Sequence, residues 1–187
     1  MYHVSDDVRV QKSAKLICEG LGKCMEEKPF DKIKISDIYE KSFVSRATFY
    51  RLFDSKTDVL SYECDKLMSE RAQTVEHADF SNKLDLAIYS INLWLSHKTL
   101  IKAIVENHLY WILYETHRKN ADILKKIYNL PYSDEKQLDY FVANLTSLIC
   151  CTLSVYFMHG ANEPIEEVYR TVCQCNNIIA EALALKR

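Results

Sequence analysis

The sequence predicts an all-α protein with an N-terminal three-helix unit and a C-terminal helical bundle. Only three Gly and three Pro occur in 187 residues, too few for the turns of an all-β sandwich or for a glycine-rich phosphate loop. Hydrophobic residues make up 48% of the chain and charged residues 27%, which is enough apolar surface for a core and excludes a disordered chain. Apolar residues also recur at spacings of three and four, as in helices with one buried face.

The first helix is predicted from about Ser5 to Lys28. Ser5, Asp6 and Asp7 supply an N-cap and acids that suit the helix dipole, and Pro29 ends the helix. Its apolar stripe consists of Val10, Ala14, Ile17, Leu21 and Met25. Gly20 and Gly22 weaken this helix, and a close crossing with another helix is the expected reason for them.

Two short helices and a longer one follow. Ser36 is expected to cap a helix through Lys41, and Ser45 to cap another through about Phe53. The connection at 42–44 is so short that the two helices must cross at a large angle. Ser55, with Asp58 three residues later, resembles the capping box of a long fourth helix.

Residues 31–56 read DKIKISDIYEKSFVSRATFYRLFDSK, and residues 27–33 read EKPFDKI. This stretch resembles the DNA-binding segment of the TetR family, whose members show a pattern like EKPFDKITVxDIAEKAGVSRGTFYxHFxxK. The resemblance covers about the first third of the chain. It implies a helix-turn-helix DNA-binding domain at 1–58, with the fourth helix linking to about 76. It further implies a ligand-binding and dimerisation domain at 77–187, with the polar stretch 76–82 as the boundary.

The second of the two crossing helices would enter the major groove of DNA. Ile38, Val44, Phe49 and Phe53 are predicted to face the small core. The outward positions that remain are candidates for DNA contact: Ser45, Arg46, Ala47, Thr48, Tyr50 and Arg51. The resemblance implies backbone contacts by Tyr50 and Lys56, and Ser36 is expected to be a further phosphate anchor. The alternative for each is an exposed polar residue or a helix cap.

Charge fits this assignment only locally. The formal net charge is -2, which by itself does not favour a nucleic-acid partner. Residues 28–56, however, contain seven basic and four acidic residues, a local excess of three positive charges. A solvated protein face can have the same excess.

The turn departs from the family pattern at two positions. Ser42 and Phe43 replace the common Ala-Gly, and a bulky residue at positive φ is strained. The alternative is a different turn, or a Phe43 packed outward against a neighbour. Leu52 stands where the family often has His, which removes one phosphate donor.

Helices are predicted over 84–95, 100–106 and 108–119, in a shorter piece through Leu130, from Asp134 to the Gly160 cap, and after Pro164. The resemblance implies a homodimer formed through the last two long helices. The apolar stripes that suit such an interface, or an ordinary intrachain core, are Phe141, Leu145, Leu148 and Thr152, then Val168, Val172, Ile179 and Leu183.

The resemblance also implies a ligand pocket in the bundle. The candidates combine aromatic rings with polar groups, as pockets do: Trp94, His108, Trp111, Tyr114 and Tyr156. Packing in a plain core is the alternative for each. The expected partners are double-stranded DNA, a second copy of the chain and a small apolar or aromatic effector.

The sequence gives little support to an enzyme or a metal-binding protein. His108, Glu115 and His117 lack the HExxH spacing, no Ser has a GxSxG context, and residues 173–175 (CQC) do not match zinc or redox spacing. We therefore expect no enzyme, metal or cofactor.

Seven cysteines form an odd set typical of reduced thiols. The start MYHVSDDVRV lacks a signal-peptide core, and the apolar run 141–158 is interrupted by polar residues and shorter than a span of about 20 residues. The expectation is a cytoplasmic, ligand-responsive repressor on a palindromic operator. The alternatives are a helical protein-interaction module and a regulator controlled by a protein co-regulator.

Overall fold

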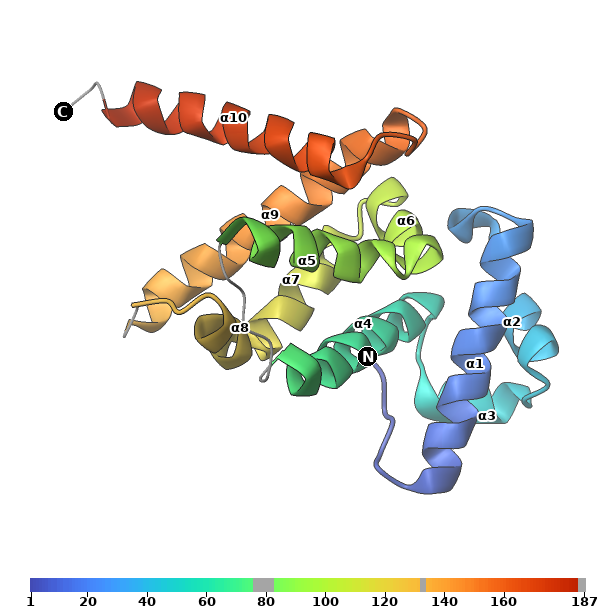
Figure 1. Ribbon diagram of the computed structural model, residues 1–187. Helices are drawn as coiled ribbons and strands as arrows, with labels where there is room; N and C mark the ends of the chain where they lie inside the picture. Colours follow the sequence, from blue (N-terminus) through green and yellow to red (C-terminus); the bar gives the residue numbers. More distant parts are fainter. Residues whose placement is uncertain (76–82, 132–133, 185–187) are drawn as a thin grey trace.

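The computed structural model describes residues 1–75, 83–131 and 134–184, and it confirms the all-α class (Figure 1). The helices are α1 (Val8–Glu27), α2 (Ile35–Ser42), α3 (Arg46–Leu52), α4 (Lys56–Val75), α5 (Lys83–Leu95), α6 (Lys98–Glu106), α7 (Tyr110–Lys119), α8 (Ala121–Ile127), α9 (Glu135–Met158) and α10 (Ile165–Ala184), with a 3₁₀ turn at Phe30–Lys32. The predicted boundary at 76–82 lies outside the described residues.

The N-terminal unit packs α1 against α2 and α3 around a small apolar core. Ile38, Phe49 and Phe53 are fully buried, as predicted, and Val44 packs against them. Burying one such side chain contributes about 1.5–3 kcal/mol, so this unit has a core of its own. α1 also touches α4 and α6, which joins the unit to the body.

Gly20 explains how closely α1 and α2 cross. A Cβ at this position would lie 2.8 Å from the Ile38 carbonyl oxygen, closer than real Cβ atoms approach backbone. The predicted role of Gly20 is therefore confirmed. Gly22 has nothing within 4 Å of the corresponding position, so close packing does not account for it.

Local capping sets most helix starts. The side chain of Asp7 accepts from the amides of Arg9 and Val10. Ser45 accepts from Thr48 at the start of α3. Ser55 and Asp58 form the reciprocal capping box of α4, with distances of 2.9 and 3.2 Å.

The predicted cap of α2 was wrong. The N-cap residue is Lys34, and Ser36 lies inside the first turn. The carboxylate of Asp37 accepts from the Lys34 amide at 2.7 Å and pairs with Lys28 Nζ at 2.6 Å. Asp37 makes the capping contact that was expected of Ser36, because its carboxylate can accept from the Lys34 amide and from the Lys28 ammonium together.

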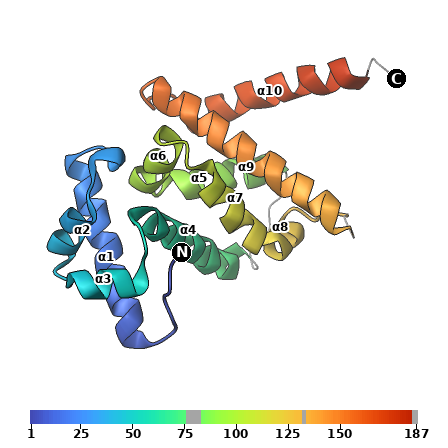
Figure 2. The same cartoon turned by 180° about the vertical axis from the view of Figure 1, so that it is seen from behind.

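The body places α7 between α4 and α9, as the two views show (Figures 1 and 2). His117 on α7 is buried, which lowers its pKa to about 4. Its Nδ1 lies 2.8 Å from Thr146 Oγ1 on α9, and its ring meets the buried Trp94 edge-on at 5.6 Å. α5, α7 and α9 are thus joined around one neutral imidazole.

α9 and α10 form the outer edge of the molecule. α10 projects beyond the body in both views, and residues 174–179 are all exposed. By length and composition α9 could cross a membrane. Val142, Ile149 and Leu153 of this helix are buried against the body, which accounts for part of its apolar composition.

Candidate nucleic-acid interface and body cavity

α3 is held by its core side and leaves one face to solvent. Phe49 and Leu52 are buried. The predicted contact residues Ser45, Arg46, Ala47, Tyr50 and Arg51 are exposed, and Thr48 is half-buried. The helix therefore presents six of the eight predicted residues together at one edge of the N-terminal unit.

Two arginines dominate that face. The Arg46 guanidinium lies over the Tyr50 ring, 5.6 Å from its centroid. Across the part of the chain that the structure describes, neither Arg46 nor Arg51 has an ion-pair partner. An unpaired guanidinium can donate to phosphate or to a guanine edge without first breaking a bond within the protein.

Ser45 and Thr48 are already joined to each other. The Ser45 hydroxyl caps the Thr48 amide at 3.1 Å and lies 2.9 Å from Thr48 Oγ1. This pairing fixes both hydroxyls at the first turn of α3. The Thr48 methyl and hydroxyl keep one orientation, which suits contact with a base edge.

Lys56 has a different environment from the one expected. Its ammonium donates to the carbonyl oxygens of Phe30, Asp31 and Ile33 at 2.7, 3.1 and 2.8 Å. An ammonium has three donors, so all are used. Desolvation lowers the pKa of Lys56, and its role as a phosphate ligand stays a prediction.

The turn between α2 and α3 is left-handed at Phe43. Its φ is 56° and its side chain is 92% exposed. Phe43 neither adopts another turn nor packs on a neighbour of this chain, so the strain expected from replacing glycine is present.

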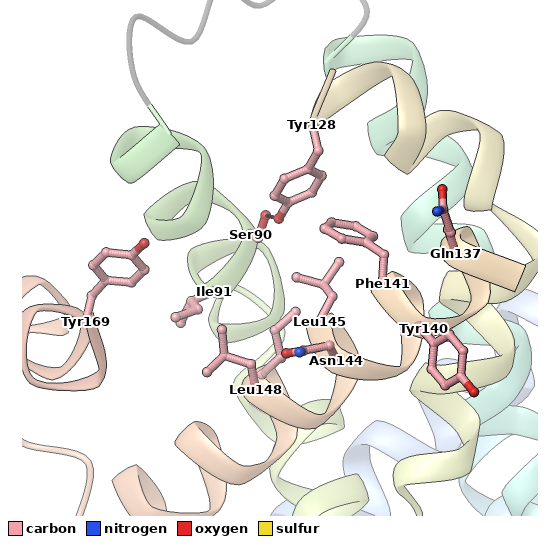
Figure 3. Close-up of a pocket in the computed structure, with 11 residues that line it drawn as sticks. Ser90, Ile91, Tyr128, Gln137, Tyr140, Phe141, Asn144, Leu145, Leu148 and Tyr169 are labelled. Atoms are coloured by element: carbon pink, nitrogen blue, oxygen red, sulfur yellow. Dashed lines mark hydrogen bonds between the residues drawn. The ribbon is translucent and has the colours of Figure 1, made fainter. Parts of the chain in front are cut away.

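The body contains a cavity of about 620 Å³ between α5, α9, α10 and the end of α8 (Figure 3). Its described lining is apolar with hydroxyl and amide groups and no charged side chain: Ser90, Ile91, Tyr128, Gln137, Tyr140, Phe141, Asn144, Leu145, Leu148, Ile149 and Tyr169. Ser90 and Tyr128 hydroxyls point at each other, 2.7 Å apart. Burial raises the pKa of Tyr128 and of Tyr169, so these phenols are neutral.

None of the predicted pocket residues lines this cavity. Trp94 is core, and Tyr114 and Tyr156 pack against the core. His108 is exposed and Trp111 is 51% exposed. Aromatic composition marked these residues, but which helices enclose a space depends on contacts distant in sequence, such as those that bring Tyr128 toward Tyr169.

The predicted dimer stripe of α9 faces inward. Phe141, Leu145 and Leu148 line the cavity, and Thr152 is buried. The outward stripe of α9 is offset from it and consists of Ser147, Cys151, Val155 and Met158, all exposed. On α10, Val168 and Val172 are half-buried, Ile179 is 57% exposed, and the Leu183 side chain lies outside the described residues.

Comparison with known proteins fits these observations. The sequence model of bacterial regulatory proteins, tetR family, matches residues 19–62, which contain α2, α3 and the start of α4. No curated protein sequence matches the chain. The crystal structure of Lin0861 from Listeria innocua superposes with a TM-score of 0.68 at 19% identity, covering 99% of this chain and 96% of that one, which shows a shared fold. Residues 19–62 thus match the DNA-binding segment of the tetR family of bacterial regulatory proteins, which supports a DNA-binding transcriptional regulator.

Proposed function

We propose that the chain is a cytoplasmic, ligand-responsive repressor that binds a palindromic operator as a homodimer. The observation that carries this proposal is the exposed face of α3, where Arg46 lies over the Tyr50 ring and neither Arg46 nor Arg51 has an ion-pair partner among the described residues. In such a dimer the two α3 helices enter successive major grooves about 34–36 Å apart, or a multiple of that distance.

The predicted contact residues divide by chemistry into those that would contact base edges and those that would contact phosphates. Arg46, Ala47 and Thr48 lie in the first turn of α3 and would meet base edges, through a guanidinium fork, a methyl group and a hydroxyl. Tyr50 and Arg51 would hold phosphates, together with Ser45 and, in the first turn of α2, Ser36.

Selection from a random-sequence duplex library tests the DNA-binding proposal. The chain should enrich an inverted repeat, and an Arg46→Ala, Arg51→Ala double variant should enrich none. Arg118→Ala is the matched control, because Arg118 is an exposed arginine on α7 in the body. Failure of the wild type to enrich any duplex would refute the proposal.

The outward stripe of α9 and the distal half of α10 support the homodimer. Val155 is 52% exposed and Ile178 is 66% exposed, and both lie on faces of long helices that nothing in the described chain covers. Contiguous exposed apolar surface typically marks an interface. Light scattering should give twice the chain mass, and Val155→Asp should give the single mass. The control Val8→Asp changes an exposed valine on α1 and should leave the dimer intact.

The cavity supports a neutral effector with an apolar or aromatic body. Its described lining has no charge to balance an ionic ligand, and burying an unpaired charge is costly. The Ser90–Tyr128 hydroxyl pair and the Asn144 amide provide hydrogen bonds. In a thermal-shift screen, neutral aromatic compounds should raise the unfolding temperature more than the corresponding carboxylates do. Tyr128→Phe should reduce the shift that these compounds cause. A set of hits that are all anions would contradict this assignment.

A further inference from the structure

Asp65 on α4 joins three segments through one carboxylate. Its side chain is only 14% exposed. Oδ2 accepts from the Tyr2 hydroxyl at 2.7 Å and from Lys119 Nζ at 2.5 Å, and Oδ1 accepts from Thr116 Oγ1 at 2.6 Å. Bonds to an ionised acceptor are roughly twice as strong as neutral ones, so this junction is a strong polar contact between α4 and α7.

On one side, the junction reaches the end of the recognition helix α3. Tyr2 forms an isolated bridge with Phe53, and the amide of His3 donates to the Leu52 carbonyl at 2.8 Å. The Tyr2 ring also meets Tyr62 edge-on at 5.4 Å. The segment at residues 2–3 therefore ties the last residues of α3 to Asp65.

On the other side, the junction reaches the wall of the cavity. Thr116 precedes His117, whose Nδ1 contacts Thr146 on α9. Thr146 lies between Leu145 and Leu148, which line the cavity. A continuous series of contacts thus runs from the cavity wall through α7 and Asp65 to the end of α3.

We infer that Asp65 is a positioning residue for DNA binding, which sets the angle of the N-terminal unit on the body through Tyr2 and Thr116. The inference rests on the proposed homodimer. In a dimer this angle determines the distance between the two α3 helices, and only a distance that matches the groove spacing lets both bind one duplex. Contacts within a single half-site do not depend on it.

The test compares two duplexes for each variant. The first is the inverted repeat selected by the wild type, and the second keeps one half-site and scrambles the other. Tyr2→Phe removes the hydroxyl on the α3 side, and Thr116→Val removes the hydroxyl on the body side with little change of shape. Each should lower affinity for the inverted repeat by about tenfold, which corresponds to about 1.4 kcal/mol. Each should leave affinity for the single half-site unchanged.

The double variant and a control separate positioning from loss of structure. If both hydroxyls act through one linkage, the double variant should lose no more affinity than either single variant. Tyr62→Phe is the control, because its hydroxyl lies on the same helix as Asp65 but donates to Gln11 on α1 and not to Asp65, and it should keep the preference for the inverted repeat. A variant that loses affinity for both duplexes equally would show a structural role and overturn the inference.

The same experiment distinguishes failure of the homodimer proposal from failure of the positioning role. A monomeric wild type, or one that binds both duplexes equally, would overturn the dimer and this inference with it. A dimeric wild type whose Tyr2→Phe and Thr116→Val variants keep the full preference would overturn the positioning role alone.

Discussion

Gly20 faces Ser42 at the crossing of α1 and α2 so closely that a Cβ on the glycine would lie 2.8 Å from the Ser42 Cβ. Gly20→Ala should therefore destabilise the protein by about 1–3 kcal/mol, because one of the two helices must shift. Gly22→Ala on the same helix meets open space and should stabilise it by about 0.5–1 kcal/mol. Urea denaturation measures both. Equal effects of the two substitutions would contradict this account of the crossing.

Phe43 holds a left-handed conformation that glycine adopts without strain. Phe43→Gly should raise the free energy of unfolding by about 1 kcal/mol, since the left-handed region costs other residues roughly 1–2 kcal/mol and glycine returns part of this as unfolded-state entropy. Phe43→Ala removes the ring but keeps the strain, and because the ring is exposed it should change stability little. Stabilisation by alanine equal to that by glycine would assign the effect to the exposed ring instead.

Glu63 makes stability depend on pH near neutrality. Burial raises its pKa from 4.5 to about 7, so the folded state binds the proton more tightly than the unfolded state. The stabilising contribution is complete below pH 4.5 and is lost as the pH rises to about 7. Glu63→Gln should remove this loss and be more stable than the wild type at pH 8, by on the order of 3 kcal/mol. Urea denaturation at several pH values measures the free energy of unfolding of each variant. The control Glu70→Gln changes an exposed glutamate of the same helix and should keep the pH dependence of the wild type.

Lys56 is expected to contribute to the stability of the fold and not to the salt dependence of DNA binding. Lys56→Met keeps the alkyl stem but leaves the carbonyls of the 3₁₀ turn without their donor, which should cost about 1–3 kcal/mol in thermal unfolding. Because its three donors are already engaged, the salt dependence of DNA binding should not change. A salt slope reduced by about one would instead establish the phosphate contact that the family resemblance implies.

Local rules predicted the helices well, and their exceptions have physical causes. The caps at Ser45 and at Ser55 with Asp58 were confirmed because a cap depends on residues three or four apart. The cap of α2 was wrong because Asp37 also pairs with Lys28, a partner on a different element. Helical periodicity contains no information of that kind.

The face of α9 and the cavity could not be predicted from one helix at a time. α9 has apolar residues on its inward stripe, such as Leu145, and on its outward stripe, such as Val155, so periodicity does not indicate which stripe meets the body. The cavity depends on how α8 and α10 are placed against α9. That placement results from packing between segments far apart in sequence.

The most direct test of the central claim is the salt dependence of binding to the selected inverted repeat. We expect log Kd to change linearly with log salt concentration for the wild type, and the slope to fall by about one for each phosphate contact removed. Arg51→Ala should show this smaller slope, and Arg118→Ala should match the wild type. If Arg51→Ala and Arg118→Ala gave the same slope as the wild type, α3 would not be the surface that binds DNA.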